Sequence, residues 1–121
     1  MKLKFNLWLE AEGEVALSLW RVRLLTAVAQ SGSINRPAAQ MHVPYRIAWQ
    51  KIHEMEERLG QKLVETQTGG QNGGGTRLTP LAQSYIEKFT QISQEVEALV
   101  QTRFKETFSE VSPTSVFNGL S

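Results

Sequence analysis

The stretch 31–60 constrains the fold more than any other part of this chain, because it has the pattern of a helix-turn-helix. Ala38, Ala39 and Met41 give a short first helix an apolar side. A tight connector follows at 42–44, and its proline fits only at the start of the next helix. The stretch therefore predicts two short helices joined by a turn.

The second helix of this motif has two different faces. One face is apolar and is expected to pack on a core; it consists of Ala48, Ile52, Met55 and Leu59. The opposite face carries the side chains that we expect at DNA bases: Tyr45, Arg46, Trp49, Gln50 and His53. Its polar members offer contacts to base edges, and its two aromatic rings pack near the sugar-phosphate surface. Trp49 has a second interpretation, since an aromatic ring between two helices can simply seal the motif.

The charge around this motif is one-sided. No acidic residue occurs between Glu14 and Glu54, whereas the same span contains Arg21, Arg23, Arg36, Arg46 and Lys51. Because the whole chain has a net charge of only +1, any affinity for nucleic acid must come from such local clusters. The candidate phosphate contacts are Arg36, Lys51, Lys62 and Arg77. Each of them can equally be an ordinary solvated charge, and the helical spacing alone also fits a plain helical bundle.

Composition excludes several other classes of protein. The 121 residues are enough for one domain with an appended helix. No cysteine is present, which excludes disulfides, zinc-thiolate sites and thiol catalysis. His42 and His53 are too few for a metal site, and we find no set of nucleophile, base and acid. We therefore expect no catalytic activity, no cofactor and no bound metal.

The N-terminal residues alternate between polar and apolar, as in a half-buried strand. Leu3, Phe5, Leu7 and Leu9 are its apolar positions. This alternation is unlike a signal peptide or a membrane span, so we expect a cytoplasmic protein without a membrane partner.

The next segment predicts a helix from a cap at Ser18 to about Gln30, ended by Gly32. Its core positions are Trp20, Leu24, Leu25 and Val28. For the following short helix, Pro37 must lie in the first turn because proline has no N–H. Ile34 or Asn35 therefore suits the cap position better than Ser33, and we prefer Asn35.

A β-hairpin, or wing, is predicted after the motif. Residues 63–67 have the Val and Thr content of a short strand, and 76–79 form the returning strand. Asn72-Gly73 favours a tight type I′ turn. The wing residues are Gly69, Gly70, Asn72, Gly73, Gly74 and Gly75. These glycines do not form a nucleotide-binding loop, because the Gly-Lys-Ser/Thr ending of such a loop is absent.

Thr79-Pro80 begins a long last helix that is expected to reach about residue 107. Its apolar residues recur alternately four and three positions apart, as in a coiled coil: Tyr85, Phe89, Ile92, Val96 and Leu99. A helix of about 40 Å is too long for one small core to cover, so the seam predicts a homodimer. The alternative is a helix that folds back on its own domain.

Several of these motifs together resemble the N-terminal DNA-binding domain of ModE-type molybdate-responsive regulators. They are 31–33, Ala38-Ala39, Tyr45-Arg46-Ile47-Ala48-Trp49, Ile52-His53-Glu54-Met55, Leu63-Val64-Glu65 and 68–79. LysR-type regulators share a looser version of the same frame. The resemblance implies a winged helix-turn-helix whose long last helix dimerises and whose N-terminal strand completes the wing sheet. In that family the molybdate-binding domain follows the long helix. This sequence contains only a short segment after that helix, so we expect no molybdate site within it.

The combined prediction is a mainly α fold with a small β-sheet, a winged helix-turn-helix with a long C-terminal dimerisation helix. Residues 1–79 are expected to form the DNA-binding domain, 80–108 the dimerisation helix and 109–121 a flexible tail. The predicted function is that of a sequence-specific transcriptional regulator, a homodimer that binds double-stranded DNA at an inverted-repeat operator. The alternative is a winged-helix module that binds a partner protein and has no specific affinity for DNA.

Overall fold

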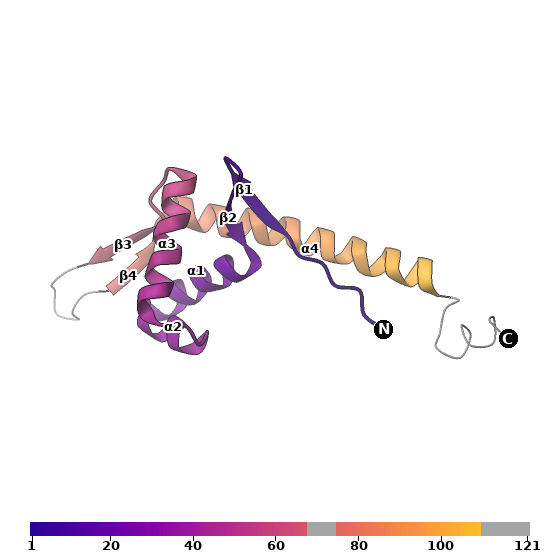
Figure 1. The fold of residues 1–121 in the computed structure, drawn as a ribbon, viewed down its shortest axis with the longest axis horizontal. Coiled ribbons are helices and arrows are strands. Elements are labelled where there is room, and N and C mark those ends of the chain that lie inside the picture. The colour runs from indigo at the N-terminus through magenta and orange to yellow at the C-terminus, as the bar shows by residue number, and fades with distance from the viewer. Residues whose placement is uncertain (68–74, 110–121) are drawn as a thin grey trace. The chain divides into compact units, whose positions relative to one another are not determined.

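The computed structural model describes residues 1–67 and 75–109. Figure 1 shows the elements in chain order: β1 (Trp8–Ala11), β2 (Glu14–Ser18), α1 (Leu19–Ser31), α2 (Asn35–Gln40), α3 (Tyr45–Leu59), β3 (Val64–Gln67), β4 (Gly75–Leu78) and α4 (Pro80–Phe108). Strands β1 and β2 form one antiparallel sheet and β3 and β4 another. The predicted fold class, a winged helix-turn-helix with a long last helix, is confirmed.

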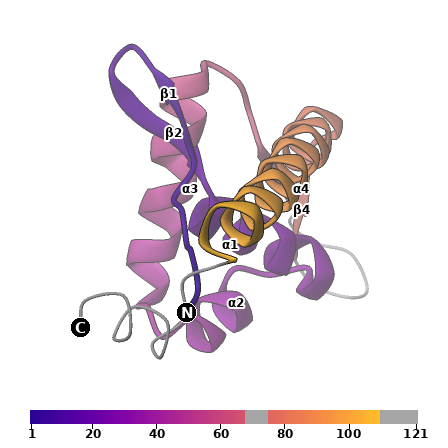
Figure 2. The ribbon, with the colours of Figure 1, turned by 90° about the vertical axis from the view of Figure 1, so that its right-hand side faces the viewer.

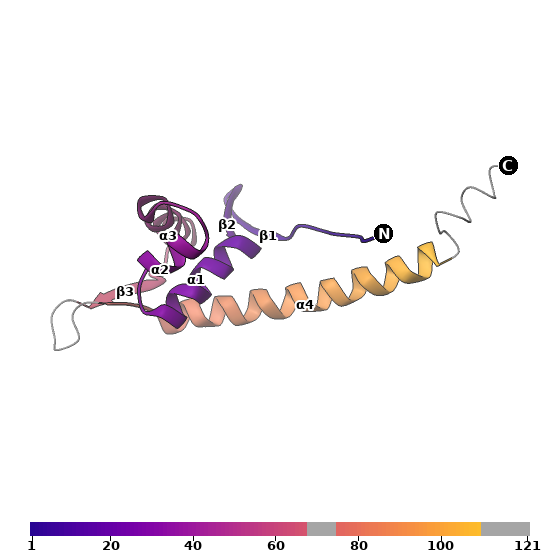
Figure 3. The same ribbon diagram turned by 90° about the horizontal axis from the view of Figure 1, so that it is seen from below.

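The chain divides into two compact units. The larger unit is Asn6–Phe89, and the smaller unit comprises Met1–Phe5 and, within the described residues, 90–109. Helix α4 contains residues of both units, since the division falls between Phe89 and Thr90; Figure 3 shows α4 along its length. No helix in the described part of the chain is long and apolar enough to cross a membrane.

The core of the larger unit is made by the predicted apolar faces. Leu24, Leu25 and Val28 of α1 are buried, and Trp20 packs against them. The apolar face of α3 is also confirmed: Ala48, Ile52 and Met55 are buried and Leu59 packs against the core. Of the three apolar positions predicted for the first helix of the motif, Ala38 is buried and Met41 packs against the core, whereas Ala39 is exposed. The expectation that Ala39 faces the core is therefore wrong.

Helix α1 begins and ends where the sequence predicts. The Ser18 hydroxyl accepts the N–H of Arg21 at 3.2 Å, which satisfies one of the unpaired donors in the first turn. At the other end Gly32 has φ +72° and donates its N–H to the Val28 carbonyl. A residue with a side chain would be strained in that left-handed conformation.

The N-terminal strand differs from its prediction in both extent and partner. It begins at Trp8 and not near Leu3, and it pairs with β2 and not with the wing. The register pairs Trp8 with Ser18 and Ala11 with Glu14. Because β2 has only 5 residues, it provides partners for no residue before Trp8. The segment before Trp8 therefore has the alternation of a strand without the neighbour that a strand needs.

The start of α2 also differs from the prediction. Asn35 is the first residue of the helix, and Ile34 occupies the cap position without a side-chain hydrogen bond. Ser33, which we considered the weaker candidate, accepts the N–H of Arg36 at 3.5 Å. Pro37 does lie in the first turn, as its missing N–H requires. The preference for Asn35 as the cap is therefore wrong by one position.

Strands β3 and β4 form the predicted hairpin, with Val64 opposite Leu78 and Glu65 opposite Arg77. The N–H of Thr76 donates to the Gly32 carbonyl at 2.8 Å, which ties β4 to the end of α1. A Cβ atom at Gly75 would lie 3.3 Å from that same carbonyl oxygen, so a glycine suits this close approach. The Asn72-Gly73 turn and the wing glycines before Gly75 lie outside the described residues.

The first turn of α4 is capped as predicted, since the Thr79 hydroxyl accepts the N–H of Ala82 at 3.1 Å. Two members of the predicted dimer seam are not free for a partner. Phe89 is buried in the core of the larger unit and Tyr85 packs against it. Later in the helix, Ile92 is 54% and Leu99 60% exposed. The exposed part of the seam therefore begins after Phe89.

Candidate nucleic-acid interface

Helix α3 is held by elements on several sides, which leaves one face free. Strand β2, α1 and α2 all contact it, and Figure 2 shows the β1–β2 hairpin running beside it. The side chains on the free face are exposed or partly exposed, and they include all five predicted base-contact residues: Tyr45, Arg46, Trp49, Gln50 and His53. The structure thus brings the predicted set together on one helix.

Two rings on this face are stacked on each other. The ring centroids of Trp49 and His53 lie 3.7 Å apart with an angle of 25° between the planes. His53 Nδ1 lies 3.0 Å from the Trp49 carbonyl oxygen. Because a carbonyl oxygen only accepts, this contact requires a hydrogen on Nδ1. Trp49 thus lies in a stack along α3, exposed and outside the buried core cluster.

The predicted phosphate contacts differ in how free their side chains are. Arg36 and Lys62 are exposed and make no ion pair within residues 1–67 and 75–109. Arg77 is 67% exposed, and its Nε lies 3.4 Å from Glu65 on the opposite strand. Lys51 lies 3.6 Å from Glu54 and is partly covered. Arg36 and Lys62 are therefore the more available cations of the set.

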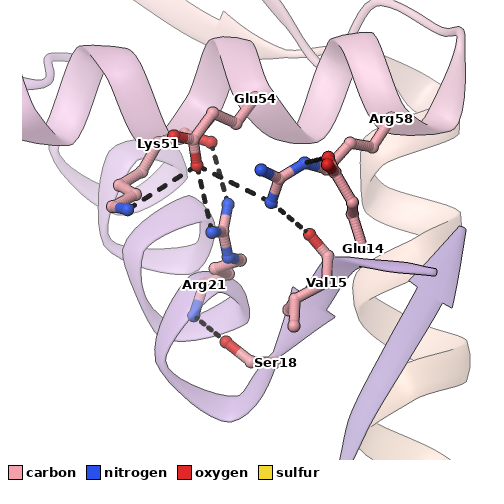
Figure 4. Close-up of polar contacts among 7 residues, drawn as sticks. All are labelled: Glu14, Val15, Ser18, Arg21, Lys51, Glu54 and Arg58. Atoms are coloured by element: carbon pink, nitrogen blue, oxygen red, sulfur yellow. Dashed lines mark hydrogen bonds and ion pairs between the residues drawn. The ribbon is translucent and has the colours of Figure 1, made fainter.

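One basic residue in the acid-free span has a structural role. Arg21 is only 8% exposed. Its guanidinium donates to the Glu54 carboxylate at 3.1 Å and to the Lys51 carbonyl at 3.3 Å, as Figure 4 shows. Both acceptors belong to α3, so Arg21 fixes α1 to that helix. The one-sided charge of the sequence consequently overstates the positive charge available to a polyanion.

A second arginine joins α3 to the N-terminal hairpin. The Arg58 Nε lies 2.9 Å from the Glu14 carboxylate, and the same guanidinium donates to the Val15 carbonyl at 2.7 Å. Glu54 is 3.8 Å away, so this carboxylate has Arg21, Lys51 and Arg58 around it (Figure 4). Together these contacts hold α3 between α1 and β2.

The pKa of Glu54 shows how strongly these charges act. Partial burial opposes ionisation of the carboxyl group, but the hydrogen bond from Arg21 and the charges of Lys51, Arg21 and Arg58 outweigh it. The pKa of Glu54 is therefore held below its ordinary value. Glu54 and Arg58 were not predicted as site residues, because their partners lie 33 and 43 residues away in sequence. The only signal was the position of Glu54 as the first acid after the basic span.

Known proteins share this arrangement of elements and residues. The pattern of the bacterial regulatory helix-turn-helix proteins of the lysR family matches residues 19–83, from α1 to the start of α4. The chain belongs to that family. It carries the DNA-binding helix-turn-helix of that family, as the sequence predicted.

Similar lysR-family relatives include several proteins named ModE. The molybdenum transport protein ModE of Azotobacter vinelandii is 34% identical over 104 residues, which is 86% of this chain and 38% of that protein. The DNA-binding transcriptional dual regulator ModE of Escherichia coli K12 is 34% identical over 94 residues, 78% of this chain and 36% of that protein. The chain thus spans little more than a third of the length of these relatives. The predicted resemblance to ModE-type regulators is confirmed.

Two solved structures share the fold of this chain. ArgP from Mycobacterium tuberculosis matches 69% of this chain and 30% of its own, with a TM-score of 0.51 and 26% identity. Full-length OxyR from Pseudomonas aeruginosa matches 71% of this chain with a TM-score of 0.51 and 21% identity, which shows similarity of fold alone.

Proposed function

We propose that this lysR-family domain binds DNA as a homodimer and reads base sequence with the free face of α3. The observation that carries the proposal is the free face itself, where Arg46 and Gln50 lie one turn apart and exposed. Of the acidic residues further along the helix, Glu54 is paired with three cationic neighbours, whereas Glu57 is exposed one turn after His53 on the same side of α3. The face therefore presents its donors, Arg46 and Gln50, in the first half of α3, ahead of that carboxylate.

The two polar side chains have distinct preferences for bases. An arginine in the major groove pairs most often with guanine, and a glutamine pairs with adenine. Because a recognition helix contacts bases mainly with its N-terminal residues, Arg46 and Gln50 are suitably placed. His53 adds a third polar side chain to this face, and the exposed rings of Tyr45 and Trp49 pack near the sugar-phosphate surface.

Phosphate contacts from flanking elements would set the register of α3 on the duplex. Arg36 of α2 and Lys62 after α3 serve this role with exposed side chains that form no ion pair in the part of the chain that the structure describes. Arg77 of the wing does so by exchanging Glu65 for a phosphate. Lys51 contributes less, because it is already paired with Glu54.

The homodimer forms through the part of the α4 seam after Phe89, which consists of Ile92, Val96 and Leu99. Ile92 and Leu99 are exposed and Val96 is partly exposed. Exposure of these apolar side chains is unfavourable, and a second copy of the seam would bury them. A symmetric dimer presents two copies of α3, so its operator is an inverted repeat with half-site centres about one helical turn apart, or a whole number of turns. We assign no catalytic activity to the chain.

The test is a measurement of DNA affinity against salt concentration, by fluorescence anisotropy with DNA from upstream of the chain's own gene. Specific binding should weaken steeply between about 50 and about 200 mM salt, because each neutralised phosphate releases counterions. A random duplex of equal length is the control and should bind much more weakly. If neither duplex binds at low salt, the chain is not a DNA reader and a protein-interaction module becomes the better account.

A further inference from the structure

Glu56 connects α3 directly to the first strand of the wing. Its side chain is buried, and its Oε2 atom accepts the N–H of Leu63 at 2.8 Å and the N–H of Val64 at 3.2 Å. Hydrogen bonds to an ionised carboxylate are stronger than those between neutral groups. Val64 is the first residue of β3, so one carboxylate oxygen fixes the point at which the wing leaves the helix-turn-helix.

The other oxygen of the same carboxylate faces the free side of α3. Glu56 Oε1 lies 3.9 Å from Nε2 of His53. The His53 ring is itself held by its stack on Trp49 and by the bond from Nδ1 to the Trp49 carbonyl. One buried side chain thus lies between a predicted base contact and the wing.

We propose that Glu56 is a positioning residue that couples the wing to the recognition helix, so that the two contact DNA as one preformed unit. This inference rests on the proposed function, because it concerns how the same surface binds DNA. The wing's own candidate contact, Arg77, lies opposite Glu65, which follows Val64 in β3. A fixed Val64 therefore keeps Arg77 at a constant position relative to α3.

The coupling has an energetic consequence. With β3 fixed in advance, a phosphate contact from Arg77 requires little ordering of the wing on binding. Without the charge of the Glu56 carboxylate, the two hydrogen bonds that it accepts from the start of β3 become weaker. Part of the free energy gained from the Arg77 contact is then spent on ordering the wing. The contribution of Arg77 to affinity should then depend on whether Glu56 is present.

A double-mutant cycle in the full chain measures this dependence. Glu56→Gln preserves the shape of the side chain and removes its charge, and Arg77→Ala removes the wing contact. In the wild-type background Arg77→Ala should weaken DNA binding, and in the Glu56→Gln background its fold-effect should be smaller by at least about threefold. Glu57→Gln is the matched control, because Glu57 is the exposed neighbour on the same helix; it should leave the effect of Arg77→Ala unchanged.

Hydrogen exchange at individual amides provides a second measurement, independent of DNA. The Leu63 and Val64 amides should exchange faster in Glu56→Gln, while the Thr76 amide, which donates to Gly32, should retain its wild-type rate. A folded Glu56→Gln protein whose effect is additive with Arg77→Ala would overturn the coupling and leave the proposed function intact. Absence of DNA binding by the wild type would instead overturn the proposed function.

Discussion

Arg21 and Glu54 lie 3.1 Å apart although 33 residues separate them in sequence. The pair joins α1 to the recognition helix, and it removes from the DNA-binding surface an arginine that composition alone assigns to it. Basic residues of this domain therefore divide into those that hold α3 in place and those that remain free. The predictions below separate the two groups.

Arg21→Met should lower stability and leave the salt dependence of DNA binding unchanged. The substitution removes hydrogen bonds from a charged donor and leaves Glu54 with fewer partners, at a cost of about 1–3 kcal/mol in the free energy of unfolding. Urea unfolding measures the first effect, and a salt titration of DNA affinity measures the second. Arg23→Met, at an exposed position of the same helix, is the control and should cost little. A reduced salt slope for Arg21→Met would instead show that the Arg21 side chain contacts a DNA phosphate.

The contribution of Glu54 to stability should depend on pH. The pKa of Glu54 is lowered in the folded state, so its stabilising effect is complete above the ordinary value of 4.5 and is lost as the pH falls through the folded value. The difference in unfolding free energy between the wild type and Glu54→Gln should be constant from about pH 7 to about pH 5 and shrink at more acidic pH. Urea unfolding at a series of pH values measures it. A difference that grew on acidification would contradict the assignment.

The double substitution of Ile92 and Leu99 by Glu should dissociate the dimer. Each apolar side chain contributes on the order of 1.5–3 kcal/mol when buried, and a charge placed there adds a desolvation penalty. Sedimentation equilibrium should show a dimer for the wild type at micromolar concentration and a monomer for the variant. Gln94→Glu, an exposed position on the same helix, should remain dimeric. A monomeric wild type would show that the α4 seam does not hold a dimer.

Arg77→Ala should weaken binding to specific and random DNA by similar factors. Loss of one phosphate contact is expected to reduce the slope of log affinity against log salt by about one. Arg103→Ala is a matched control, because Arg103 is also 67% exposed and paired with a glutamate. It lies on α4 and should leave the slope unaltered. A loss confined to particular operator bases would show that the wing reads sequence.

Elements with local signals were predictable from the sequence. The ends of α1 follow from Ser18 and Gly32, whose cap geometry depends only on near neighbours. The core face of α3 follows from periodicity, because an amphipathic helix can bury only one side. Strand β2 was missed, since Val15, Ala16 and Leu17 form a short apolar run without the alternation of a strand.

Features that depend on distant partners were not predictable. The spacing of Phe89 matches the α4 seam, but this residue is buried because it reaches the core formed by residues far earlier in the chain. The pairing of Arg21 with Glu54, and of Glu56 with the start of β3, likewise exists only after the chain has folded. The outward position of Arg46 and Gln50 follows from helical periodicity, whereas the bases that they contact depend on the docked DNA.

The most direct test of sequence readout by α3 is a binding-site selection from random DNA, run in parallel with the wild type and Arg46→Ala. The wild type should select an inverted repeat with guanine at one fixed position of each half-site. Arg46→Ala should lose that preference, with a cost of about 1–3 kcal/mol for the selected site and much less for random DNA. An unchanged base preference would exclude Arg46 from direct readout, and a selected site without a repeat would contradict the symmetric dimer.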